Sequence, residues 1–197
     1  MKTYEKLNEL IKACHWMNQQ GYSPATSGNY SVRVGNDELM ISASGVDKGN
    51  LQPSDFLKIK TSGDLVDRDR KPSDESAIHA RIMALHPEVE CVLHSHSLAS
   101  TIVSLKTRED CIVFKGFEMQ KAFTGIGDHK TPVRVNVIEN TQAIPALAKN
   151  LQKQPLPCFI LRGHGVYTWG NSIAQAKRHL QGIEFLLQCK LELMRHK

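Results

Sequence analysis

The chain has 197 residues, and 41% of them are hydrophobic. This is enough to bury one full core, so we expect a single domain over residues 1–197. No stretch approaches the roughly 20 apolar residues of a membrane span, and the N-terminus has no apolar signal-peptide core. Five scattered cysteines without a C-x-x-C motif indicate free thiols in a reducing compartment, which predicts a cytoplasmic protein.

The net charge of +5 indicates an anionic partner. Proteins that bind nucleic acid usually concentrate their basic residues and place aromatic residues between them. Here lysine and arginine are spread along the chain, and only 6% of the residues are aromatic. The sequence therefore favours a small anionic substrate over nucleic acid, and it predicts no membrane partner.

The first part of the chain predicts two helices separated by three strands. Apolar residues at helical spacing predict a helix over residues 4–20 that ends at Gly21. Residues 23–28 are rich in Ser, Thr, Pro and Gly, which is typical of a loop. Ser73 is the expected N-cap of a helix that runs to Leu85. Short alternating runs between the two helices predict antiparallel strands over residues 30–34, 39–42 and 56–60.

The second part of the chain continues with short strands and helices. A buried strand over residues 91–93 leads into His94, and Asn171 is the expected N-cap of a long final helix. Between them the patterns predict helices over residues 98–105, 119–123 and 141–151 and strands over residues 111–114, 133–137 and 158–161. The predicted fold is an α/β domain in which helices flank a largely antiparallel central sheet.

His94 and His96 stand one residue apart at the end of the apolar run Cys-Val-Leu. In a strand, residues i and i+2 point to the same face, so both imidazoles can converge on one point. A divalent metal requires such convergence. The pair alone is also compatible with two ordinary histidines, and the interpretation depends on the rest of the chain.

His164 is the third candidate ligand, because it lies between two glycines just after a buried strand. Three histidines are the ligand set of many catalytic zinc sites, which leave one position open for water or substrate. Glu75 is a fourth side chain that could reach the metal, or it serves only as a partner of its helix dipole. His79 is expected to form hydrogen bonds near the site rather than to bind the metal.

Polar, glycine-containing turns at residues 27–29, 42–45 and 72–73 offer backbone N–H groups and hydroxyls that could form an anion pocket. Each of them is also a common turn. Glu118 follows a strand-like run and a glycine, and the pattern alone favours a solvated surface carboxylate there.

Five short segments, taken together and in this order, resemble the class II aldolase superfamily, the zinc-dependent sugar-phosphate aldolases and epimerases with the fuculose-phosphate aldolase fold. The segments are SGNYSVR at 27–33, SASG at 42–45, PSDE at 72–75, VLHSH at 92–96 and RGHG at 162–165. The resemblance covers nearly the whole chain.

Three longer segments, SASGVDKG, GFEMQK and RGHGVYTWG, are similar to a dehydratase branch of this superfamily that acts on 5-methylthioribulose 1-phosphate in methionine salvage. In the aldolases the position of Glu118 is usually a tyrosine that protonates the leaving carbanion. In the dehydratases it is a glutamate that serves as acid and base. The resemblance therefore implies a hydro-lyase that removes water, with Glu118 as the catalytic acid and base.

The same resemblance implies that His94, His96 and His164 hold one Zn²⁺ per subunit, and that Glu75 matches the aldolase base. It places the substrate phosphate at Asn29, Ser44, Gly45 and Ser73. Asp74 departs from the aldolase pattern, which has a small hydroxyl residue, so we expect either that it points away from the phosphate or that the pocket is built differently in this chain. The family usually assembles as a homotetramer with sites between neighbouring subunits.

Two alternatives remain open from the sequence. One is a class II aldolase or epimerase that cleaves or inverts a sugar phosphate. The other is a non-catalytic binding module, since adducin head domains resemble this fold and lack the metal ligands. The three histidines and both glutamates of this chain favour an enzyme.

Overall fold

The computed structural model describes residues 3–66 and 72–195, and its eight strands form one sheet. The strand order is β3-β2-β1-β4-β8-β7-β6-β5, and every neighbouring pair is antiparallel except β6 and β7. The strands are β1 Asn29–Arg33, β2 Glu38–Ser42, β3 Phe56–Lys60, β4 Cys91–Ser95, β5 Cys111–Phe114, β6 Val133–Ile138, β7 Cys158–Leu161 and β8 Gly165–Gly170. The predicted largely antiparallel sheet is confirmed.

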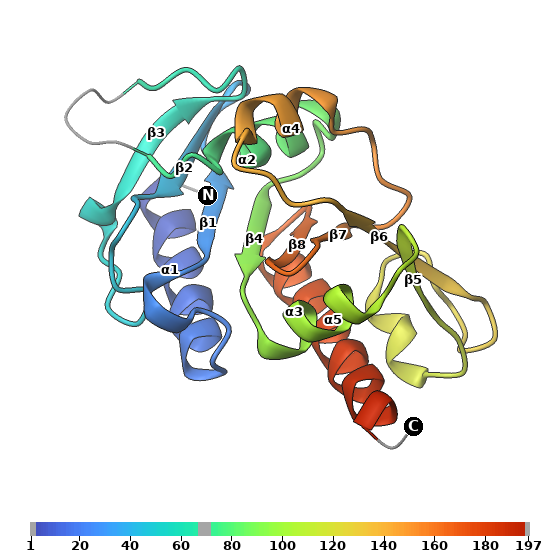
Figure 1. The fold of residues 1–197 in the computed structure, drawn as a ribbon. Helices are drawn as coiled ribbons and strands as arrows, with labels where there is room; N and C mark the ends of the chain where they lie inside the picture. Colours follow the sequence, from blue (N-terminus) through green and yellow to red (C-terminus); the bar gives the residue numbers. More distant parts are fainter. Residues whose placement is uncertain (1–2, 67–71, 196–197) are drawn as a thin grey trace.

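Five α-helices cover both faces of this sheet, so that the structure has three layers (Figure 1). The helices are α1 Thr3–Gln19, α2 Ser76–Leu85, α3 Leu98–Lys106, α4 Ile144–Asn150 and α5 Ile173–Arg195, with short 3-10 helices η1 Pro24–Thr26, η2 Pro53–Asp55 and η3 Glu118–Ala122. Apolar residues of α1, α3 and α5 form one core with one face of the sheet. Those of α2 and α4 form a second core against the other face.

The central strands β4 and β8 are buried along their whole length, since a core lies on each side of them. Strand β8 was not predicted, because a strand that is buried on both faces loses the alternation of polar and apolar residues. Its register pairs His94 with Tyr167 and Ser95 with Val166. This pairing places the end of β4 beside the turn that joins β7 to β8.

Two glycines allow this turn to come so close. A Cβ atom on Gly165 would lie 2.0 Å from the carbonyl oxygen of Ser95, which is far inside van der Waals contact. Gly163 has a φ of +65°, and a Cβ atom there would lie 2.9 Å from the side chain of Leu105. Both positions therefore require glycine.

Three predicted helix starts were wrong. Helix α2 begins at Ser76 rather than at Ser73, because a turn intervenes in which Ser76 N–H donates to the Ser73 carbonyl at 2.9 Å. Helix α5 is capped by Ser172 rather than by Asn171, since the Ser172 hydroxyl accepts the Gln175 N–H at 3.1 Å. The helix predicted from residue 141 begins at Ile144, so that Pro145 lies in its first turn.

The five cysteines are free, and three of them are buried, as predicted: Cys14, Cys91 and Cys158. In the part of the chain that the structure describes, no helix is both long and apolar enough to cross a bilayer.

Candidate metal centre

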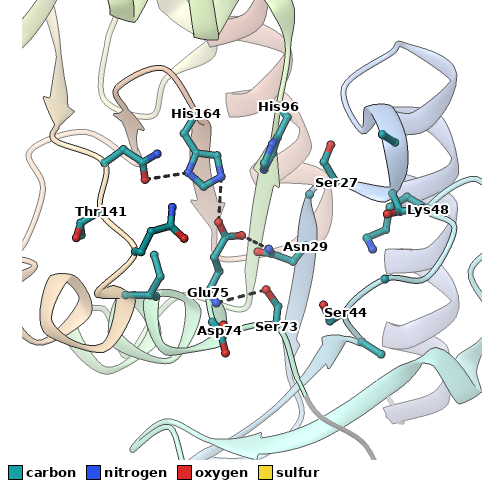
Figure 2. Close-up of a pocket in the computed structure, with 18 residues that line it drawn as sticks. Ser27, Asn29, Ser44, Lys48, Ser73, Asp74, Glu75, His96, Thr141 and His164 are labelled. Atoms are coloured by element: carbon teal, nitrogen blue, oxygen red, sulfur yellow. Dashed lines mark hydrogen bonds and ion pairs between the residues drawn. The ribbon is translucent and has the colours of Figure 1, made fainter.

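The three predicted histidines converge at the end of β4. Figure 2 shows two of them, His96 and His164, beside Glu75. His94 Nε2 lies 2.8 Å from His96 Nε2 and 3.4 Å from His164 Nε2. Glu75 joins them, and one ligand atom from each of the four side chains lies within 4.8 Å of all the others. The predicted convergence of His94 and His96 is observed, although His96 lies one residue beyond the end of β4. His164 joins them from the turn between β7 and β8.

Hydrogen bonds turn the Nε2 atoms of two of these rings toward the centre. The Nδ1–H of His94 donates to the Val166 carbonyl at 3.0 Å, and the Nδ1–H of His164 donates to Asn140 Oδ1 at 3.3 Å. In a neutral imidazole the other nitrogen then carries a lone pair. Burial lowers the pKa of His94 well below its ordinary value, so this ring is neutral at neutral pH.

Burial and the charge of His164 also lower the pKa of His96, to about 4. The backbone N–H of His96 donates to the Tyr22 carbonyl at 2.9 Å, which holds the residue in place after it leaves the strand. The ring is therefore available as a neutral ligand.

Glu75 supplies the negative charge of the cluster. Its Oε1 lies 3.0 Å from His164 Nε2 and its Oε2 lies 3.6 Å from His94 Nε2. Burial alone would raise the pKa of this carboxyl, but the hydrogen bonds from His164 and Asn29 and the charge of His94 hold it well below its usual range. Glu75 precedes helix α2 as its N-cap residue, and its side chain makes no capping bond there. It is thus aimed at the histidines instead of at its own helix.

The donor set fits a divalent metal. An imidazole nitrogen that faces a carboxylate oxygen at 3.0 Å needs either a proton or a metal ion between the two atoms, and a bound divalent ion would take the place of the proton. Ligand atoms of a tetrahedral site with bonds of about 2.0–2.1 Å lie roughly 3.3 Å apart. The observed separations of 2.8, 3.0, 3.4 and 3.6 Å lie on both sides of this value. Three histidines with a carboxylate suit zinc and also other first-row divalent ions.

A chain of hydrogen bonds through Asn29 and His79 holds the Glu75 carboxylate in place. The Nδ2 group of Asn29 donates to Glu75 Oε2, and Asn29 Oδ1 accepts from His79 Nε2 at 2.5 Å. The Ser31 hydroxyl donates to His79 Nδ1 at 2.8 Å, and burial lowers the pKa of His79 to about 3, so its ring is neutral. The prediction that His79 forms hydrogen bonds near the site is confirmed. The sequence did not show that Asn29 joins it to Glu75.

A pocket of about 400 Å³ opens beside the cluster. Four residues predicted to bind phosphate line it together with Glu75, His96 and His164: Asn29, Ser44, Gly45 and Ser73. Asp74 also lines the pocket, and its carboxylate points away from the histidines (Figure 2). Its orientation relative to a bound phosphate stays a prediction. The pocket further contains Lys48, from the segment SASGVDKG, and residues that no motif indicated, among them Thr26, Asn140, Thr141 and Gln142.

Glu118 lies away from the histidine cluster within the single chain. It begins the 3-10 helix η3, its side chain is 69% exposed, and it forms ion pairs with Lys121 and His129. It lines a separate cavity with residues of α1 and α5, including Trp16 and Phe185. One chain therefore does not bring Glu118 to the histidines.

A buried carboxylate contacts the end of β4 from the opposite face of the sheet. Glu184 of α5 is fully buried, and it accepts a hydrogen bond from the hydroxyl of Ser95 at 2.6 Å. Ser95 ends β4 and stands between His94 and His96 in the sequence. Burial raises the pKa of Glu184 to about 7, although the hydroxyls of Ser95 and Ser97 act in the opposite direction.

Residues 8–191 match the class II aldolase and adducin N-terminal domain family, so the chain belongs to that family. Among its curated relatives, the methylthioribulose-1-phosphate dehydratase of Yersinia pestis (strain Pestoides F) is 42% identical, over 98% of this chain and 89% of that protein. The protein of the same name from Serratia proteamaculans (strain 568) is 40% identical, over 98% of this chain and 97% of its own length.

Two solved structures show the same fold at low sequence identity. An L-fuculose 1-phosphate aldolase superposes with a TM-score of 0.82 at 20% identity, over the whole of this chain and 89% of that one. The L-fuculose-1-phosphate aldolase of Thermus thermophilus gives a TM-score of 0.77 at 22% identity, over 98% of both chains.

We predict that the wild-type protein binds about one divalent ion per chain and that His96→Ala weakens this binding at least roughly 100-fold, since losing a supporting group alone costs 10–100-fold. The matched control is His129→Ala, because His129 is 47% exposed and lies outside the cluster. Metal analysis after dialysis and titration against a chromophoric chelator would measure both variants. Equal affinity in the two variants would contradict the assignment of the site.

A second prediction concerns Glu184 and pH. Its pKa in the folded protein is about 7, above the ordinary value of 4.5, so the folded state retains a proton that the unfolded state has lost. The contribution of Glu184 to the free energy of unfolding is therefore fully present below about pH 4.5. As the pH rises through 7 this contribution is lost, which lowers the free energy of unfolding by up to about 3 kcal/mol. Glu184→Gln has no such proton.

Between pH 5 and pH 8, the free energy of unfolding of metal-free wild type should fall relative to that of Glu184→Gln. Denaturant titration at the two pH values would measure the change, with Glu192→Gln, an exposed change on the same helix, as control. A difference between wild type and Glu184→Gln that does not vary with pH would contradict the assignment.

Proposed function

We propose that this chain is a zinc-dependent methylthioribulose-1-phosphate dehydratase of the cytoplasm. The observation that carries the proposal is its 40–42% identity, over 98% of its length, to proteins of that name. The histidine cluster supports it, because a non-catalytic adducin-like module would have no use for four converging metal-binding side chains. The reaction converts 5-methylthioribulose 1-phosphate to 2,3-diketo-5-methylthiopentyl 1-phosphate and water, a step of methionine salvage.

His94, His96 and His164 would hold the zinc ion, and Glu75 lies close enough to approach it. When bound, the metal would supply Lewis-acid polarisation of the substrate's carbonyl and hydroxyl oxygens. The pocket of about 400 Å³ is of a size that suits a small sugar phosphate, with Asn29, Ser44, Gly45 and Ser73 along its wall.

The reaction needs a base and an acid. A base removes the proton from C3, the electrons shift to give a C2–C3 enediol, and loss of the C4 hydroxyl as water leaves an enol that becomes the diketone. We assign both proton transfers to Glu118. Glu75 is ionised, hydrogen-bonded to Asn29 and adjacent to His164, so it suits a role as base or metal neighbour better than a role as acid.

Glu118 can reach the pocket only from another copy of the chain, so we propose a homotetramer with sites between subunits. The 69% exposed side chain of Glu118 supports this arrangement, as do exposed apolar residues on the same side of the molecule: Met119, Phe185 and Leu193. In the single chain, Lys121 and His129 lower the pKa of Glu118. Burial between subunits would raise this pKa toward the range that an acid needs at neutral pH.

Mass spectrometry of the products tests the reaction. Zinc-loaded protein incubated with 5-methylthioribulose 1-phosphate should give a product that has lost one water and kept its carbon chain. Two smaller fragments would instead establish an aldolase, the activity of the relatives that share only the fold. Unchanged substrate would refute the proposed substrate.

We predict that Glu118→Gln keeps its bound metal and loses at least roughly 100-fold in kcat, because general acid–base catalysis contributes 10²–10⁴-fold. His96→Ala should be inactive for a different reason, since it lacks the metal. If the two residues act in one site from different subunits, mixed and reassembled tetramers of the two variants should regain part of the wild-type activity.

The control for this complementation is a mixture of His96→Ala with His164→Ala, which removes two ligands of the same chain and should stay inactive. Activity of Glu118→Gln alone at the wild-type level would refute the role of Glu118. An inactive mixture of Glu118→Gln and His96→Ala tetramers, with mixing verified by native mass spectrometry, would refute its supply from a neighbouring subunit.

A further inference from the structure

Lys48 is a buried cation that the reaction described above does not use. It lies in the loop between β2 and η2, and only 2% of it is exposed. Its side chain lines the pocket beside the metal centre. Lysine is almost never fully buried unless it has a partner, because removing an ammonium group from water costs several kcal/mol or more.

The partners that the chain provides are too few. The Lys48 ammonium group has three donors, and in the described residues it donates one hydrogen bond, to the Val46 carbonyl at 2.9 Å. Asp47 and Asp55 attract it electrostatically, yet it forms no ion pair within 4 Å with a described carboxylate. Two donors of a buried charge are therefore left for a ligand.

A second group in the same pocket has the same deficit. The hydroxyl of Ser27 is buried, and no described residue gives it a hydrogen bond, while the residue lines the pocket with Lys48. Figure 2 shows Ser27, Lys48 and Ser44 on one side of the pocket, opposite Glu75 and His164. Two groups with unsatisfied donors, the Lys48 ammonium and the Ser27 hydroxyl, thus belong to the side of the pocket opposite the metal centre.

The positive charges around the pocket indicate which kind of molecule it binds. The charge of Lys48 is felt at His96, where it helps to lower the pKa. A divalent ion in the cluster would add positive charge at the other side of the same 400 Å³ pocket. A molecule that binds between the metal ion and Lys48 should have oxygen atoms that can coordinate the metal at one end and a negatively charged group that faces Lys48 at the other.

We propose that Lys48, assisted by the hydroxyl of Ser27, binds the phosphate group of the substrate and makes the enzyme specific for the phosphorylated sugar. The inference rests on the proposed function for the identity of the sugar. Asn29 could not offset the charge of a phosphate, because its amide is neutral and already bonds to Glu75 and His79. Lys48 is a substrate-binding residue in this proposal and takes no part in proton transfer.

The experiment uses the zinc-loaded full chain with Lys48→Gln, Lys48→Arg and the control Lys149→Gln, which removes an exposed positive charge on α4. The KM for 5-methylthioribulose 1-phosphate should rise at least 10-fold in Lys48→Gln, with kcat within about 3-fold of wild type. Lys48→Arg should recover part of the loss, and Ser27→Ala should raise KM by a smaller factor of about 2–5.

The dephosphorylated sugar, 5-methylthioribulose, isolates the phosphate contact. Its inhibition constant against the phosphorylated substrate should be the same in wild type and in Lys48→Gln. A loss of kcat in Lys48→Gln without a rise in KM would overturn the proposal, because Lys48 would then act at the reacting atoms. Equal weakening of the sugar with and without phosphate would also overturn it.

Titration calorimetry with inorganic phosphate separates this inference from the proposed function, because it needs no turnover. Phosphate affinity at least 10-fold weaker in Lys48→Gln than in Lys149→Gln would support the anion subsite even if 5-methylthioribulose 1-phosphate were not consumed. Equal phosphate affinity, in a protein that does dehydrate the substrate, would overturn the role of Lys48 and leave the function intact.

Discussion

The antiparallel pairing of β4 with β8 is the constraint on which the site depends. It sets the last residues of β4 against the first residues of β8, with Ser95 opposite Val166. Because His164 immediately precedes β8, the same register that closes the centre of the sheet also brings the third ring to the first two. The Nδ1–H of His94 crosses this pairing to the Val166 carbonyl, so one interaction joins the strands and orients a ligand.

The side chains around this pairing comprise neutral histidines, one ionised carboxylate and one buried lysine. The rings of His94, His96 and His79 are neutral because burial disfavours their charged forms. Glu75 is the only ionised carboxylate among the four converging side chains, and a divalent ion would leave the centre with net positive charge. The buried ammonium of Lys48 adds to this positive potential, which suits a dianionic substrate and agrees with the excess of basic residues in the chain.

Sequence patterns predicted the metal centre better than its surroundings, for a physical reason. His94 in β4 and His96 just beyond its end face the same point, as the two-residue period of an extended chain predicts, and the glycines around His164 mark a turn that must come close to another chain segment. The hydrogen bonds of Asn29 and the burial of Lys48 depend instead on which loops meet in space. No local period encodes them.

The errors in the predicted elements have related causes. Strand β8 lacks alternation because both of its faces are covered. Ser73 has the features of an N-cap, but a turn that delivers Glu75 to the histidines precedes the helix, so the needs of the site prevail over local capping preference. The separation of Glu118 from the histidines could not be predicted either, because it depends on the packing of η3 against α5, which no local pattern encodes.

The glycines on either side of His164 carry a further consequence for how such proteins are recognised. Neither glycine offers a functional group, yet the Ser95 carbonyl leaves no room for a Cβ atom at Gly165, and the φ of +65° at Gly163 strains any other residue. The motif Gly-His-Gly therefore reflects the close approach of two backbone segments as much as the chemistry of the histidine. A related sequence that kept the histidine but carried an alanine in place of Gly165 would have to separate its two central strands, and its ligand would then face an empty centre.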